Sequence, residues 1–129
     1  MPEEDHHSFT IGLVGPCTAG KSILRAKLET QGYRVKHIAQ EHSFVKDMWK
    51  RVTNPDVLVF LDVSYPTTLL RRKWDFRESD YQEQLHRLAH AREHADIYVN
   101  TDALTPDEVL DEVLKAVKTM GIRASTTLA

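Results

Sequence analysis

The chain has 129 residues, of which 41% are hydrophobic and 28% charged, with 17 Lys and Arg against 19 Asp and Glu. This content is typical of a folded soluble domain and excludes a disordered chain. The net charge of -2 gives no general attraction to nucleic acid or to membranes, so neither is an expected partner.

One domain is expected over residues 1–129, with flexible ends at 1–8 and 122–129. The first eight residues are polar and acidic, and the longest clean apolar run, Val57 to Leu61, is too short to cross a bilayer. We therefore expect neither a signal peptide nor a membrane span. Cys17, the single cysteine, excludes an intramolecular disulfide and favours a cytoplasmic protein.

Strands and helices are predicted to alternate along the chain. Apolar or alternating runs predict strands at 9–14, 33–39, 57–61 and 97–100. Helical spacing predicts helices over 21–31, 42–52, 66–72, 79–94 and 105–118. This order is typical of a parallel sheet of about four strands between two layers of helices, an α/β fold of the three-layer α/β/α kind.

Several helix starts carry capping signals. Ser64 is placed to cap the helix near Pro66, and Thr105 with Glu108 has capping-box spacing. Ser79 with Gln82 has the same spacing, and that helix is expected to turn Tyr81, Leu85 and Leu88 inward. The 42–52 helix is expected to bury Phe44, Met48 and Trp49.

The strongest motif joins the first strand to the first helix. Residues 15–22 read Gly-Pro-Cys-Thr-Ala-Gly-Lys-Ser and match G-x-x-x-x-G-K-[ST], the Walker A pattern. Glycines let such a loop curl its amide groups around a phosphate, and the following helix adds its positive N-terminal end. We expect the loop to bind nucleotide phosphates through Gly15, Pro16, Cys17, Thr18, Ala19, Gly20, Lys21 and Ser22.

Within this motif, Lys21 is expected to reach the β- and γ-phosphates, and the Ser22 hydroxyl to ligate Mg²⁺. A second, acidic metal ligand is also needed. Asp62 ends a buried strand in the manner of a Walker B carboxylate, and Glu41 follows the preceding strand at the same edge of the sheet. The sequence alone does not choose between them.

From Phe9 to Lys118 the chain resembles P-loop nucleoside and nucleotide kinases, including the adenylate, thymidylate and shikimate kinase relatives. Besides the loop, residues 54–72 (NPDVLVFLDVSYPTTLLRR) resemble the strand and helix that lead into an arginine-bearing lid. Residues 95–109 (ADIYVNTDALTPDEV) are similar to the last strand, the adenine-side loop and the final helix.

The resemblance implies an ATP- and Mg²⁺-dependent kinase that transfers the γ-phosphoryl group to a small acceptor. It implies that Arg71, Arg72 and Arg77 are lid arginines, with Arg72 and Arg77 closing over the γ-phosphate and Lys21 and Glu41 also serving catalysis. It further implies that Asp102 to Thr105 border the adenine.

The chain departs from this family in the short segment between Glu41 and Val57, where the family has an inserted acceptor-binding region. If the usual third strand is the missing one, the strand order becomes 2-1-3-4, Glu41 takes the metal or base position, and Asp62 is structural. An alternative function is therefore a nucleotide-binding module or slow ATPase that acts through a protein partner.

Three other features are interpreted as structural. His86, His90 and His94 are expected to form a solvent-exposed stripe opposite Leu85 and Leu88. Cys17 is interpreted as a small loop residue without a redox role. Trp49 is expected to anchor a short helix, and Trp74 lies among the lid arginines, where it either packs or stacks on a base.

Overall fold

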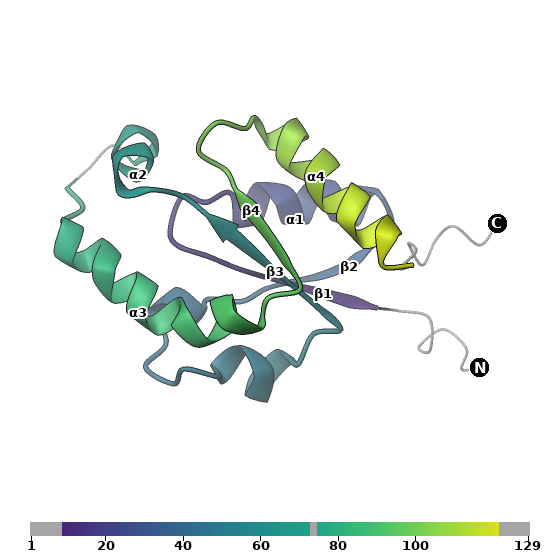
Figure 1. The fold of residues 1–129 in the computed structure, drawn as a ribbon, viewed down its shortest axis with the longest axis horizontal. Coiled ribbons are helices and arrows are strands. Elements are labelled where there is room, and N and C mark those ends of the chain that lie inside the picture. Colours follow the sequence, from purple (N-terminus) through teal and green to yellow (C-terminus); the bar gives the residue numbers. More distant parts are fainter. Residues whose placement is uncertain (1–8, 73–74, 122–129) are drawn as a thin grey trace.

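A four-stranded, all-parallel sheet forms the centre of the protein. The computed structural model describes residues 9–72 and 75–121. Its strands are β1 (Thr10–Val14), β2 (Arg34–His37), β3 (Val57–Asp62) and β4 (Ile97–Asn100), in the order β2-β1-β3-β4. This confirms the predicted parallel sheet and its 2-1-3-4 order, in which the carboxyl ends of β1, β2 and β3 meet at one edge (Figure 1).

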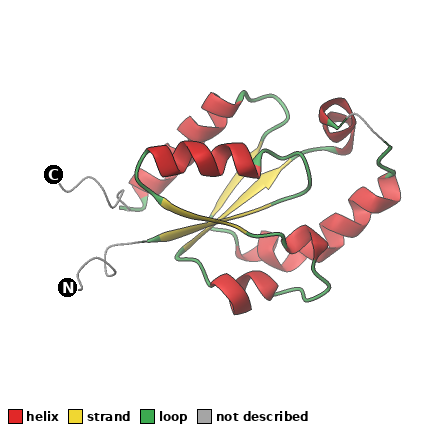
Figure 2. Cartoon of the chain, turned by 180° about the vertical axis from the view of Figure 1, so that it is seen from behind, coloured by secondary structure: helices red, strands yellow, loops and turns green. Residues whose placement is uncertain are grey.

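Helices cover both faces of this sheet (Figures 1 and 2). On one face lie α1 (Lys21–Thr30) and α4 (Pro106–Thr119), and on the other lie α3 (Glu78–His94) and a short π-helix, η3 (Trp49–Thr53). A seven-residue helix, α2 (Tyr65–Arg71), follows β3, and a 3₁₀ turn, η2 (Gln40–His42), follows β2. The mixed α/β architecture agrees with the predicted helical layers.

The two faces of β3 explain these layers. Its side chains alternate between two hydrophobic clusters, with Val57, Val59 and Leu61 toward α1 and α4, and Leu58 and Phe60 toward α3. All five are at most 1% exposed. A strand buried on both faces reads as a continuous apolar run, which is why this segment was predictable.

The predicted 42–52 helix forms only at its end, as η3, and the segment before Met48 is not the helix that the sequence predicted. Buried Gln40 organises this segment instead, because its Oε1 accepts the N–H of Trp49 and its Nε2 donates to the carbonyl of Val45. Such side-chain bonds offer the backbone partners other than those of a helix. Trp49 is buried as predicted, but Phe44 is 84% exposed and does not point inward.

The start and inner face of α3 also differ from the prediction. The helix begins at Glu78 rather than at Ser79, and the Asp80 carboxylate accepts the N–H of Arg77. Its buried residues are Tyr81, Gln84, Leu88 and Ala91, whereas Leu85 is half-buried. Gln84 thus takes the inward-facing place that the sequence analysis assigned to Leu85.

The other two predicted caps are confirmed. The Ser64 hydroxyl accepts the N–H of Thr67 at the start of α2. The Thr105 hydroxyl accepts the N–H of Glu108, whose carboxylate accepts the N–H of Thr105 in return.

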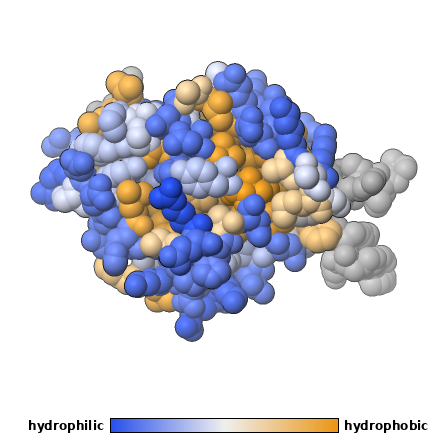
Figure 3. All heavy atoms as spheres, in the orientation of Figure 1, coloured by the Kyte–Doolittle hydropathy of each residue, from blue (hydrophilic) through white to orange (hydrophobic). Residues whose placement is uncertain are grey.

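Within the described residues, none of the helices has the length and apolar character needed to cross a membrane. The face shown in Figure 3 is mostly hydrophilic, with hydrophobic atoms gathered where β4 and α4 lie in Figure 1.

Candidate functional site

The loop from Gly15 to Ser22 joins β1 to α1 at the carboxyl edge of the sheet. A Cβ atom at Gly15 would lie 2.0 Å from the carbonyl oxygen of Leu61, so only glycine lets the loop pass this close to β3. Gly20 has a φ angle of 97° and Thr18 one of 68°, both left-handed. These turns lead the chain directly into the N-terminus of α1.

The N-terminus of α1 presents unused donors. Its first helical hydrogen bond runs from the N–H of Leu24 to the carbonyl of Gly20. The N–H groups of Lys21, Ser22 and Ile23 therefore precede the helical ladder and have no partner within the helix. Together with the positive end of the helix dipole, they can hold an anion.

Lys21 is folded back into the loop. Its Nζ donates to the carbonyls of Gly15 at 2.5 Å and Pro16 at 3.1 Å, and lies 3.1 Å from Glu41 Oε2. Both side chains of the Lys21–Glu41 pair are 5% exposed. The pair links the loop after β1 to η2, which follows β2, so two strand ends contribute opposite charges to one site.

Gln84, on the inner face of α3, holds the same loop through two hydrogen bonds to Cys17. Its Oε1 accepts the N–H of Cys17 at 3.0 Å, and its Nε2 donates to Cys17 Sγ at 3.1 Å. The sequence analysis missed this residue. The spacing Tyr81, Gln84, Leu88, Ala91 is nevertheless a helical stripe, and the amide within it was the available signal.

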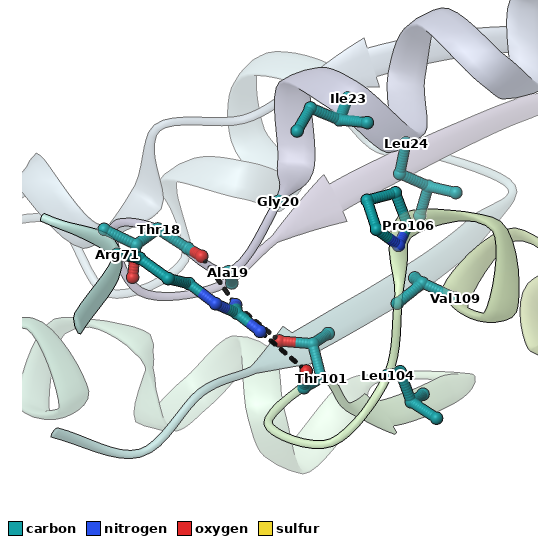
Figure 4. A pocket seen from close by; sticks show the side chains of 10 residues that line it. All are labelled: Thr18, Ala19, Gly20, Ile23, Leu24, Arg71, Thr101, Leu104, Pro106 and Val109. Atoms are coloured by element: carbon teal, nitrogen blue, oxygen red, sulfur yellow. Dashed lines mark hydrogen bonds between the residues drawn. The ribbon is translucent and has the colours of Figure 1, made fainter. Parts of the chain in front are cut away.

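Arg71 closes the opposite side of the loop (Figure 4). Its Nη1 donates to the Thr18 carbonyl at 2.8 Å and to Thr101 Oγ1 at 3.1 Å, and its Nη2 donates to the Thr101 carbonyl at 2.7 Å. This guanidinium therefore connects α2, the Gly15–Ser22 loop and the end of β4.

Two cavities flank the loop and share Thr18, Gly20, Ile23 and Arg71. The first, of about 240 Å³, is mainly apolar and lies between α1 and the start of α4, as Figure 4 shows. It is also lined by Ala19, Leu24, Thr101, Leu104, Pro106 and Val109. The second, of about 490 Å³, also has much apolar lining surface, but ionisable and hydroxyl side chains reach it, and we call it the polar cavity for them. Its further lining residues are Cys17, Lys21, Ser22, His37 and Glu41.

His37 is a site residue that the sequence analysis did not single out. Its Nδ1 lies 3.5 Å from the Ser22 hydroxyl. Burial first, and then the charge of Lys21, lower the pKa of His37, with Glu41 acting in the opposite direction. These surroundings therefore favour the neutral imidazole.

The two candidate carboxylates have different surroundings. Glu41 lines the polar cavity, and its Oε1 is buried without a hydrogen-bond partner among the described residues. Asp62 lies on the α3 side of β3, where its Oδ2 accepts the hydroxyl of Tyr98 and lies 4.0 Å from Arg92. Asp62 thus has protein partners, whereas Glu41 retains a free oxygen beside the loop.

The other predicted site residues lie around this centre. The Arg72 guanidinium packs 4.4 Å from the Phe76 ring, and Arg77 is largely exposed beside Asp80. Asp102 accepts the N–H of Ser64, and Thr105 caps α4 instead of lining the apolar cavity, where its neighbour Leu104 lies. Trp74 is outside the described residues.

The predicted solvent-exposed histidine stripe holds for His86 and His94, which are exposed, but not for His90. His90 is half-buried and accepts a hydrogen bond from Trp49 Nε1 at 3.1 Å, and the rings of His90 and His94 stack. His90 is half-buried because the Trp49 ring, from η3, packs against α3 beside His90 and His94.

A comparison with protein-family models gives no match, and neither does a comparison with curated protein sequences. The interpretation of the site therefore depends on the chemistry of its own residues.

Proposed function

We propose that this chain is a P-loop protein that binds ATP with Mg²⁺ and transfers the γ-phosphoryl group to a small acceptor. The observation that carries the proposal is the Gly15–Ser22 loop, which leads into the open N-terminus of α1 beside a buried Lys21. The proposal includes a cytoplasmic setting, the compartment favoured by a single cysteine.

The phosphate chain would occupy the polar cavity. Lys21, Ser22 and Ile23, whose N–H groups precede the helical ladder of α1, line this cavity, and Lys21 and Arg71 supply positive charge. Lys21 now donates to two loop carbonyls, which are weaker partners than a phosphate oxygen because they carry no full charge. We expect Lys21 to exchange these carbonyls for the β- and γ-phosphates when nucleotide binds.

The residues present fit a magnesium ion. Ser22 and Glu41 line one cavity, both offer the oxygen ligands that Mg²⁺ prefers, and Glu41 Oε1 has no hydrogen-bond partner among the described residues. Bound there, the ion would neutralise charge on the phosphates. The partners of Asp62 favour a structural role for that carboxylate.

The adenine would occupy the apolar cavity beside Leu24, Leu104 and Val109. This cavity adjoins the phosphate site through Thr18 and Gly20, so a single ligand can extend from one cavity into the other. Thr105 would act there indirectly, because its hydroxyl is used in capping α4 and thereby positions Pro106 and Leu104.

For transfer, the chain would need cations around the γ-phosphate. Arg71 already lies beside the loop, and we propose Arg72 and Arg77 as residues that approach when nucleotide binds. Catalysis by such a site comes from positioning and charge stabilisation rather than from a covalent intermediate.

A second candidate function is a nucleotide-binding module that signals to a protein partner. The segment between β2 and β3 packs onto α3 through Gln40, which donates to the Arg87 carbonyl, where the family resemblance requires an acceptor site. In addition, Leu70 of α2, next to Arg71, is 79% exposed, and Phe44 is 84% exposed. Each of these two apolar side chains is accessible to a partner protein.

The rate of ATP turnover, with and without a small acceptor, distinguishes the kinase from the nucleotide-binding module. ADP release from ATP and Mg²⁺ should be measured alone and with a panel of nucleosides, nucleotides and small hydroxy acids. Stimulation by one acceptor supports the kinase, whereas an unchanged slow rate supports the module.

A matched pair of variants tests the magnesium ligands. We expect Glu41→Gln to raise the Mg²⁺ concentration needed for half-maximal ATP binding by about tenfold, and Asp62→Asn to leave it within about twofold. The reverse order would contradict the assignment of Glu41.

A further inference from the structure

The rim of the Gly15–Ser22 loop carries a cluster of side chains of the metal-ligand type, and nucleotide binding gives no role to the thiol or to the imidazole in it. Cys17 Sγ, His42 Nε2 and a Glu41 carboxylate oxygen all lie within 4.8 Å of one another. Cys17 belongs to the loop after β1, whereas Glu41 and His42 belong to η2 after β2. We propose that these three side chains form a binding site for a thiophilic divalent metal ion, with Zn²⁺ as the best fit.

The distances suit zinc. Cys17 Sγ lies 3.9 Å from His42 Nε2, which lies 3.7 Å from Glu41 Oε2. Bonds of about 2.3 Å to sulfur and 2.0–2.2 Å to nitrogen and oxygen place tetrahedral ligands roughly 3.3–3.7 Å apart. Small side-chain rotations would therefore close the site around an ion.

The ligand types select the metal. A thiolate and an imidazole favour Zn²⁺ over Mg²⁺ and Ca²⁺, which prefer oxygen ligands. Three protein ligands leave a fourth tetrahedral position for water or another small ligand. The site shares Glu41 with the Ser22–Glu41 pair proposed for Mg²⁺ but differs from it in its thiolate and imidazole ligands.

The surroundings support each ligand. Gln84 accepts the N–H of Cys17 through Oε1, which turns its Nε2 toward Cys17 Sγ and holds the sulfur in place. Glu41 pairs with Lys21 through Oε2 but keeps Oε1 buried and without a hydrogen-bond partner within the described residues. His42, whose side chain is 60% exposed, can rotate onto an arriving ion.

Cobalt provides a specific probe, because Co²⁺ replaces Zn²⁺ in such sites and gives a charge-transfer band when a thiolate binds it. Cys17 is the chain's only cysteine, so any such band reports on this residue. The full chain should be titrated with Co²⁺ under a thiol-free phosphine reductant, without nucleotide or Mg²⁺, and then with Zn²⁺. We expect a one-to-one thiolate band that Zn²⁺ abolishes.

Variants then test the other ligands. We expect Cys17→Ser to remove the band and His42→Ala to weaken Co²⁺ affinity by at least about tenfold. His86→Ala, an exposed histidine elsewhere on the surface, is the matched control and should leave affinity within about twofold. Circular dichroism melting of each variant shows whether it is folded.

Two results would overturn the proposal: no thiolate band at saturating Co²⁺, or a band of unchanged affinity in a folded His42→Ala variant. Because nucleotide is absent from the assay, this outcome is independent of whether the chain binds ATP.

Discussion

The ammonium of Lys21 lies 3.1 Å from Glu41 Oε2, and each of these two side chains is only 5% exposed. A buried pair of this kind adds little net stability over a hydrophobic pair, but removal of one partner leaves an uncompensated charge. The pair therefore has consequences for folding as well as for ligand binding.

We predict that Lys21→Met lowers the free energy of unfolding by about 3 kcal/mol, and that adding Glu41→Gln recovers much of the loss because glutamine is neutral. Lys27 is on the same helix as Lys21, and Lys27→Met, which breaks its more exposed pair with Asp107 of α4, should cost less than about 1 kcal/mol. Urea denaturation of the four proteins measures these differences. Equal losses for Lys21→Met and Lys27→Met would contradict the prediction.

Gly15 and Gly20 provide a second matched pair. We predict that Gly15→Ala destabilises the protein by about 3 kcal/mol or more, because the new Cβ would meet the Leu61 carbonyl oxygen at 2.0 Å. Gly20→Ala has open space around its Cβ and should cost only about 1–2 kcal/mol for its left-handed φ. Thermal or urea unfolding measures the stability loss of each variant. A larger loss for Gly20→Ala than for Gly15→Ala would refute the prediction.

Arg71 and Arg77 are expected to act differently. Arg71→Gln removes a guanidinium that joins Thr18 to Thr101 between the two cavities, so ATP affinity should fall by about tenfold or more. Arg77→Gln alters a largely exposed residue outside both cavities, so it should lower turnover while leaving ATP affinity within about twofold. Binding and turnover measured on both variants separate these effects. Loss of affinity only in Arg77→Gln would place the site elsewhere.

His37 should titrate below its ordinary value of 6.5, because burial and then the charge of Lys21 lower its pKa. The unfolded chain therefore takes up this proton first as pH falls, and His37 reduces the free energy of unfolding below about pH 6.5. Bound phosphates should raise the pKa, because nearby negative charge favours the imidazolium. NMR titration of the ring with and without ATP and Mg²⁺ checks both directions. A titration midpoint of His37 at or above pH 6.5 in the nucleotide-free protein would contradict the predicted lowering of its pKa.

The strands were predictable because each central strand is an uninterrupted apolar run. Burial of both faces of β3 leaves no polar alternation to interpret, and β1 follows the same rule. β4 is an edge strand with Ile97 and Val99 buried and Tyr98 exposed, and its apolar residues alone predicted it. The failure at 42–52 has a different cause. There the buried Gln40 side chain bonds to the backbone of Trp49, nine residues on, and to that of Arg87 in α3, 47 residues on. The hydrophobic periodicity of residues 42–52 contains no sign of these two bonds.

The loop itself was predictable from spacing, but its surroundings were only partly so. His37, His42, Gln84 and Arg71 come from four different elements, and their convergence depends on strand order and on the phase of each helix. The choice between Glu41 and Asp62 also required the fold, since their side chains lie in different surroundings at neighbouring strand ends.

The central claim is that the Gly15–Ser22 loop holds a nucleoside triphosphate. Isothermal titration calorimetry with ATP and Mg²⁺ should give saturable one-to-one binding for the unaltered chain and for Lys27→Met. It should give at least about tenfold weaker binding for the more stable Lys21→Met/Glu41→Gln double variant. Absence of binding heat for every triphosphate tried, at several temperatures, or unchanged affinity in the double variant, would contradict the claim.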